Sequence, residues 1–113
     1  MLENVKFENL EKLDLSRNSL SNINILEYAN FKELKELNLS YTNISDIKVL
    51  EKIKFKKLEE LDLSRNKIIN MDILENVNFK ELKELDLYHN EIFKSENELI
   101  ISKLQSKIND FRV

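Results

Sequence analysis

A period of 24 residues runs through most of this chain and limits what it can fold into. Leucines fall in three aligned columns. The columns are Leu10, Leu34, Leu58 and Leu82; Leu13, Leu37, Leu61 and Leu85; and Leu15, Leu39, Leu63 and Leu87. A repeat of this length predicts one supersecondary unit per period, and such units bury their apolar faces only by stacking on one another. The sequence therefore favours a coiled solenoid over a bundle or a sandwich.

Within each unit the spacing L-x-L predicts a short strand, because alternate side chains of a strand point to the same side. Leu13 and Leu15 then face the core, while Lys12, Asp14 and Ser16 face outward. Stacked copies of this strand predict a parallel sheet with about 4.8 Å between neighbouring strands. The outward positions of all units then form one continuous polar face.

An asparagine column follows each predicted strand. Asn18, Asn66 and Asn90 occupy it, with Thr42 in the second unit. A buried Asn amide has donors and an acceptor, so we expect it to bond backbone groups of its own turn and of the neighbouring turn. Thr42 keeps a hydroxyl but reaches less far, and we expect a weaker rung there.

The second half of each unit predicts a short helix of about two turns. Asn22, Asp46 and Asn70 are good N-cap residues, and the apolar residues after them follow helical spacing. A phenylalanine column closes the units and is expected to pack between the layers. Its members are Phe7, Phe31, Phe55 and Phe79.

Four segments follow the pattern LxxLxLxxNx(L/I), namely LEKLDLSRNSL, LKELNLSYTNI, LEELDLSRNKI and LKELDLYHNEI. In them the chain resembles the leucine-rich-repeat superfamily over roughly residues 2–94. The resemblance implies the α/β class, as a right-handed solenoid with a parallel concave β-sheet and short convex helices. Downstream segments such as SDIKVL are similar to the short-repeat subclass that includes a regulatory subunit of type 1 protein phosphatase and the bacterial internalins. It implies a mode of binding but no particular partner.

We expect a single leucine-rich-repeat domain over residues 1–113. Its predicted parts are a partial repeat at 2–9, full repeats at 10–33, 34–57 and 58–81, a last strand and turn at 82–94, and a C-terminal cap helix within 95–113. Because the chain begins in the middle of a unit, the strand near Leu13 is expected to be an edge that is thinly covered.

The predicted cap helix spans residues 96–110 and covers the core of the last repeat. Ser95 and Glu98 fit a capping box, in which a Glu follows the capping Ser by three residues. An apolar helical face follows. Its members are Ile101, Leu104, Ile108 and Phe111.

Composition argues against several functional classes. The net charge is −3, from 18 basic and 21 acidic residues, so no basic stripe for nucleic acid is expected. There is no apolar run long enough for a membrane span and no visible signal peptide. With no cysteine in the sequence, a cytoplasmic protein is expected. We expect no cofactor and no catalysis, because His89 is the only histidine and glycine-rich phosphate loops are absent.

The outward positions of the sheet are the candidate partner-binding site on the concave face. The candidates are Arg17, Glu36, Tyr41, Glu60, Asp62, Arg65, Glu84, Asp86, Tyr88 and His89. They predict an acidic stripe that a basic protein or peptide would complement, beside a rim of arginine and aromatic residues, which are enriched at binding hot spots. A plain solvated face, with charges inherited by duplication, explains the same acidic pattern.

Two functional hypotheses follow from this pattern. The first is a protein–protein interaction module that binds a protein or peptide partner on the concave face. The second is a structural repeat scaffold that self-associates, for example as a homodimer, through the open N-terminal edge.

Overall fold

The computed structural model describes residues 8–77 and 79–113. The partial repeat predicted at residues 2–9 therefore lies outside the described residues, apart from positions 8 and 9. The same holds for Phe7 of the phenylalanine column.

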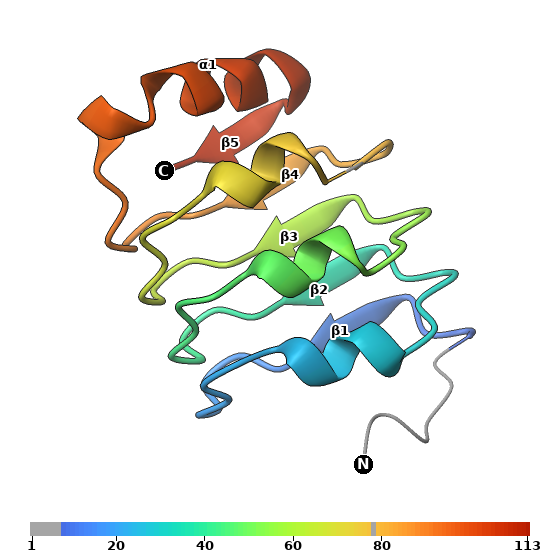
Figure 1. The fold of residues 1–113 in the computed structure, drawn as a ribbon. Helices are drawn as coiled ribbons and strands as arrows, with labels where there is room; N and C mark the ends of the chain where they lie inside the picture. Colours follow the sequence, from blue (N-terminus) through green and yellow to red (C-terminus); the bar gives the residue numbers. More distant parts are fainter. Residues whose placement is uncertain (1–7, 78) are drawn as a thin grey trace.

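The described chain forms one sheet of five parallel strands, which lie side by side in chain order (Figure 1). The strands are β1 (Lys12–Asp14), β2 (Glu36–Asn38), β3 (Glu60–Asp62), β4 (Glu84–Asp86) and β5 (Asp110–Arg112). The register pairs Leu13 with Leu37, Leu37 with Leu61, and Leu61 with Leu85. Each leucine column thus runs across the sheet, as the 24-residue period predicts.

Short 3-10 helices connect the first four strands, on the opposite side from the sheet (Figure 1). They are η2 (Asn24–Tyr28), η3 (Lys48–Glu51) and η4 (Asp72–Glu75). The predicted length of two α-helical turns was wrong, because the chain returns to the next strand after four or five helical residues. The predicted N-cap positions were wrong by one residue, because the N-caps are Ile23, Ile47 and Met71 and none has a side-chain cap bond. The predicted residues instead bond within the turn before each helix. The side-chain oxygens of Asn22, Asp46 and Asn70 each accept a bond from the backbone N–H two residues later, at 2.8–3.1 Å.

The core lies between the sheet and these helices and consists of the aligned columns. Leu34, Leu39 and Ile44 are fully buried, as are their counterparts in the third repeat. The phenylalanine column also packs as predicted, since the rings of Phe31 and Phe55 stack with centroids 6.1 Å apart. Phe79 continues the stack, 6.4 Å from Phe55.

The asparagine column joins neighbouring repeats at Asn66 and Asn90, and we call this row of side-chain bonds the asparagine ladder. Asn66 is buried, and its Nδ2 donates to the carbonyl oxygens of Leu39 in the previous repeat and Leu63 in its own, at 2.9 and 3.0 Å. Its Oδ1 accepts the backbone N–H groups of Thr42 and Ile44. With a further bond from its Nδ2 to the Ser64 carbonyl at 3.2 Å, one side chain joins two turns at five backbone groups.

Thr42 forms a weaker rung, as predicted. Its hydroxyl donates to the carbonyl oxygen of Leu39 at 2.6 Å, within its own repeat. Among the described residues, Thr42 bonds to the first repeat through its backbone, because its carbonyl accepts the Leu20 N–H at 3.1 Å. The seam between the first and second repeats thus lacks the side-chain bracket that Asn66 provides one repeat later.

The C-terminal region differs from the prediction. The helix α1 covers Glu98–Lys107 rather than residues 96–110, and β5 follows it. The capping box is wrong, because Ser95 lies in the 3-10 helix η5 (Lys94–Glu96) and the N-cap of α1 is Asn97, with no side-chain cap bond. Leu104 is buried as expected.

Phe111 is not on a helix face but in β5, where it pairs with Leu85, 26 residues earlier. Ile108 and Val113 then continue the columns of Leu82 and Leu87 with the same shift of two residues. The chain therefore adds a fifth strand of the repeat pattern, and α1 takes the place of a 3-10 helix in the row that covers the sheet (Figure 1).

Candidate binding surface on the sheet

The outward face of the sheet carries two rows of side chains that the register aligns. The first row is Lys12, Glu36, Glu60, Glu84 and Asp110. The second row is Asp14, Asn38, Asp62, Asp86 and Arg112. Five of the ten predicted site residues lie in these rows, so the structure brings the acidic members of the set together.

This face is hollow at its centre. Glu36, Glu60 and Glu84 line a depression of about 220 Å³, and Asp62 and Asp86 lie on the same depression. The depression is open to solvent and crosses several strands, which is a shape that suits a chain or loop of another protein better than an enclosed small molecule.

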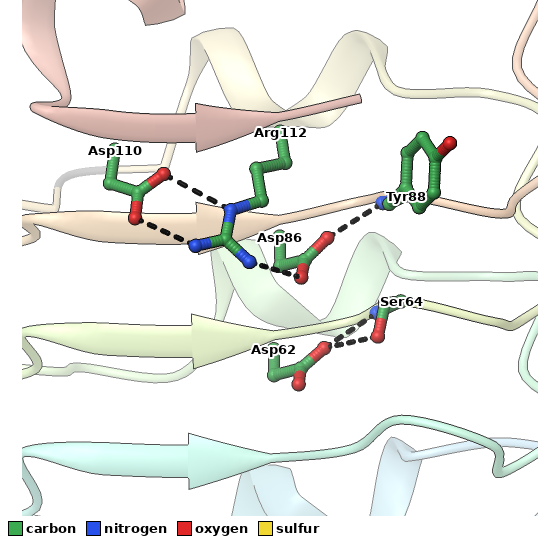
Figure 2. Close-up of polar contacts among 6 residues, drawn as sticks. All are labelled: Asp62, Ser64, Asp86, Tyr88, Asp110 and Arg112. Atoms are coloured by element: carbon green, nitrogen blue, oxygen red, sulfur yellow. Dashed lines mark hydrogen bonds and ion pairs between the residues drawn. The ribbon is translucent and has the colours of Figure 1, made fainter.

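A basic side chain of the protein itself forms ion pairs at each end of the acidic rows. Lys12 Nζ lies 3.1 Å from Glu36 Oε2, and this hydrogen bond raises the pKa of Lys12. At the other end Arg112 Nη2 lies 3.1 Å from Asp110 Oδ2, and Nη1 lies 3.8 Å from Asp86 Oδ2 (Figure 2). The hydrogen bond to Asp110 raises the pKa of Arg112. Between these two ends lie the carboxylates whose negative charge is least compensated by the chain's own cations.

Glu60 sits at the centre of the first row. Partial burial raises the pKa of Glu60, and the neighbouring charges of Glu36 and Glu84 raise it further. Like charges directly opposite each other on neighbouring strands are destabilising. The row therefore stores electrostatic repulsion that a cation placed over Glu60 and Glu84 would relieve.

The aspartates of the second row have a structural role that the sequence analysis missed. One oxygen of Asp62 accepts bonds from the backbone N–H and the hydroxyl of Ser64, at 2.9 and 2.6 Å, and Asp86 accepts the backbone N–H of Tyr88 at 2.9 Å (Figure 2). At the equivalent position, hydrogen bonds from Ser16 lower the pKa of Asp14. An aspartate as the last residue of each of these strands is the signal that would have found these Asx turns, with the spacing Asp-x-Ser at Asp14 and Asp62.

A rim of larger side chains follows the rows, at the turns after the strands. The guanidinium carbon of Arg17 lies 4.9 Å from the ring centroid of Tyr41, and that of Arg65 lies 5.3 Å from it. Arginine over an aromatic face is a favourable cation–π contact. The three side chains come from three successive repeats, so the structure brings Arg17, Tyr41 and Arg65 into one exposed cluster.

Tyr88 and His89 form a second cluster on this rim, in the turn after β4. Their ring centroids lie 4.2 Å apart. His89 shares a left-handed backbone with Arg17, Tyr41 and Arg65, with φ between 55° and 61° at the four positions. The left-handed backbone is uncommon for residues other than glycine. The sequence contains no glycine, so each turn presents a side chain there.

Two family models match the chain. The model described as Leucine Rich repeats (2 copies) matches residues 8–52, and the model described as Leucine Rich Repeat matches residues 57–78. The chain belongs to the leucine-rich-repeat family. A comparison with curated proteins finds no match.

Membership in the leucine-rich-repeat family supports the general functional class. Leucine-rich repeats are generally protein-interaction modules, and the family is typically non-enzymatic. The resemblance to the phosphatase-regulator and internalin subclass stays a prediction. The matched segments end at residue 78 and so do not include β4, α1 or β5 of this leucine-rich-repeat chain.

Metal binding and membrane crossing can both be judged on the part of the chain that the structure describes. Among residues 8–77 and 79–113, no group of three or more His, Cys, Asp or Glu side chains is arranged to hold a metal ion. No helix in these ranges is long and apolar enough to cross a membrane.

Proposed function

We propose that this leucine-rich-repeat chain is a protein–protein interaction module that binds a basic protein or peptide segment on the hollow face of its sheet, and that it is not an enzyme. The observation that carries the proposal is the uncompensated centre of the acidic rows. The chain's own cations reach Glu36 at one end and Asp86 and Asp110 at the other. A partner's lysine or arginine over Glu60 and Glu84 would supply the missing charge.

The predicted site residues take different parts in this proposal. Glu60 and Glu84 are the charge anchors, and Glu36 is shared with Lys12. Asp62 and Asp86 each give one oxygen to a turn, so only the remaining oxygen faces a partner. This division favours the glutamate row as the site of charge recognition.

The rim supplies contact area beside the charge anchors. The rim residues among the candidates are Arg17, Tyr41, Arg65, Tyr88 and His89. Tyr41 and Tyr88 are about half exposed, at 44% and 52%. Tyrosine rings in that state bury large areas on binding at little cost in side-chain entropy, and arginines are enriched at binding hot spots. We therefore expect a partner segment that carries basic residues for the rows and a hydrophobic or acidic residue for the rim.

Selection from a library of displayed random peptides tests the charge anchors directly. The wild-type chain should select peptides enriched in lysine and arginine. Affinity for those peptides should fall about tenfold in Glu60→Gln/Glu84→Gln, as expected for loss of charge pairs worth about 1–2 kcal/mol together. The matched control is Glu27→Gln/Glu51→Gln, which changes the net charge equally on η2 and η3, opposite the sheet.

Selected peptides without basic residues would contradict the proposal. So would basic peptides that bind the two double variants equally, because the attraction would then come from net charge rather than from the rows. Replacing Tyr41 and Tyr88 by Ala tests the rim separately, and unchanged affinity for the selected peptides would remove the rim from the site.

A further inference from the structure

The two outer strands of the sheet expose part of the apolar side chains whose equivalents on the inner strands are buried. Leu13 in β1 and Leu15 just after it are half-buried, whereas the equivalent Leu37 and Leu39 of the second repeat are at most 1% exposed. Phe111 and Val113 are half-buried at the other end. Within residues 8–77 and 79–113, β1 pairs only with β2 and β5 only with β4. In these ranges, both outer strands therefore carry column residues that no further strand covers.

The backbone groups at these two edges match each other. At each seam the later strand donates near its start and accepts near its end. Asp110 N–H donates to the Lys83 carbonyl, and Leu87 N–H donates to the Arg112 carbonyl. Because backbone groups alternate in direction along a strand, those of Phe111 and Val113 point away from β4, and those of Lys12 and Asp14 point away from β2. This is the same pairing of positions that joins β1 to β2.

The outward charges at the two edges are opposite in both rows. The first row ends with Lys12 on β1 and Asp110 on β5, and the second row ends with Asp14 on β1 and Arg112 on β5. A second copy that continues the sheet in the same register would place its Lys12 beside Asp110 and its Asp14 beside Arg112. Opposite charges directly across neighbouring strands are stabilising.

A groove of mixed character lies between α1 and β5. It has a volume of about 940 Å³, with Ile101, Phe111 and Val113 as its aliphatic and phenylalanine lining and polar or charged residues such as Glu98 and Gln105 around them. The matching surface at the other end is the half-buried set Leu10, Leu13, Leu15 and Leu20. A contact between the end of one copy and the start of the next covers both surfaces at once.

We propose that copies of this chain associate head to tail, with β5 of one copy pairing in parallel with β1 of the next. The contact is heterologous, because different edges of the two copies meet, and it can repeat to give longer arrays. It is independent of the peptide site proposed on the sheet face, which remains open in such an array.

Sedimentation velocity of the full chain, over a wide concentration range at low and high salt, tests this proposal. The wild type should form larger species as concentration rises, less so at high salt because the charged rows are exposed. Lys12→Glu and Asp110→Lys should each weaken association about tenfold or more, because each places like charges together at the contact. An equimolar mixture of the two variants should restore association, because Lys at position 110 then meets Glu at position 12.

Matched controls are Lys52→Glu and Glu51→Lys, which make the same charge changes beside η3. They should associate as the wild type does. Thermal melts of all variants identify any loss of fold, and restored association in the mixture is incompatible with unfolded partners.

Two results would overturn the proposal. A wild type that stays monomeric at every concentration at low salt would remove the contact altogether. Association that Lys12→Glu disrupts and Asp110→Lys does not would assign the interface to a symmetric pairing of two β1 strands instead.

Discussion

Two seams of the stack share the same period but are held together by different bonds. One lies between the second and third repeats, and the other lies between the first and second. At the former, the buried side chain of Asn66 bonds backbone groups of two turns. At the latter, Thr42 offers the first repeat its backbone carbonyl, which accepts the Leu20 N–H. The comparison indicates that one residue per repeat sets how firmly neighbouring turns are joined, while the leucine columns set only that they stack.

The largest effect is expected from removing the strong bracket. Asn66→Ala leaves the backbone N–H groups of Thr42 and Ile44 without their acceptor in the buried interior. Each unsatisfied buried group costs about 1–3 kcal/mol, so the free energy of unfolding should fall by about 3 kcal/mol or more. Urea unfolding followed by circular dichroism measures it.

The control for this change is Asn18→Ala, in the same column but exposed. Among the residues that the structure describes, Asn18 donates to carbonyls of its own turn, those of Leu15 and Ser16. Its replacement should cost well under about 1 kcal/mol. Equal losses in the two variants would show that the ladder does not distinguish the seams.

The reverse experiment strengthens the weak seam. Thr42→Asn should let the amide reach the turn of the first repeat, as Asn66 reaches the turn of the second. The added bonds should raise the free energy of unfolding by about 1 kcal/mol. This gain is reduced where an added bond replaces the existing one from the Leu20 N–H to the carbonyl of residue 42. Unchanged or reduced stability would mean that the first turn, where Ser21 also has a positive φ, is too differently shaped to accept the bracket.

A smaller contribution comes from outside the core. Tyr41 lies between Arg17 and Arg65 and so spans both seams. Tyr41→Ala should lower stability by about 1 kcal/mol, given about 0.5–1 kcal/mol for an exposed cation–π pair. Tyr28→Ala, an exposed tyrosine on η2, is the control and should cost less. A double-mutant cycle of Tyr41 with Arg17 that gives no coupling free energy would exclude a stabilising contact between them across the first and second repeats.

The smallest effect concerns the charges that cross both seams. Since the pKa of Glu60 is raised above its ordinary 4.5, the folded chain holds that proton more tightly than the unfolded chain. This favours the fold below the unfolded pKa and is lost as the pH rises through the folded pKa. Glu60→Gln should therefore raise stability at pH 7 by a few tenths of a kcal/mol. The difference should disappear as the pH falls below 4.5.

Thermal melts of the wild type and Glu60→Gln at several pH values measure this, with Glu27→Gln on η2 as the control. A stability gain for Glu60→Gln that persists unchanged at pH 3 would assign the effect to packing rather than to charge.

The repeat pattern predicts the sheet, its register, the phenylalanine stack and the ladder, because each depends on residue types at fixed intervals. It does not predict β5, because Phe111 pairs with Leu85 at 26 residues rather than 24 and so falls outside every column. A search for LxxLxL that allowed other apolar residues and a shifted period would have found Ile108, Phe111 and Val113.

The candidate surface was predicted in outline only. Strand alternation places Glu36, Glu60 and Glu84 on the outward face from the sequence alone. The Asx bonds of Asp62 and Asp86 and the stacking of Arg17 and Arg65 on Tyr41 depend on turn geometry, which side-chain periodicity does not describe. Arg112 was missed because its strand was missed, and it supplies the charge that closes the acidic rows.

The left-handed row at Arg17, Tyr41, Arg65 and His89 has an evolutionary consequence. A non-glycine residue in this conformation costs roughly 1–2 kcal/mol, which glycine would avoid. In return, every turn displays a replaceable side chain on a backbone whose course is already fixed by the Asx bonds and the ladder. On the proposed binding surface, substitution at these four sites would alter what the molecule recognises while the packed interior stays the same, so specificity and foldability could be inherited separately.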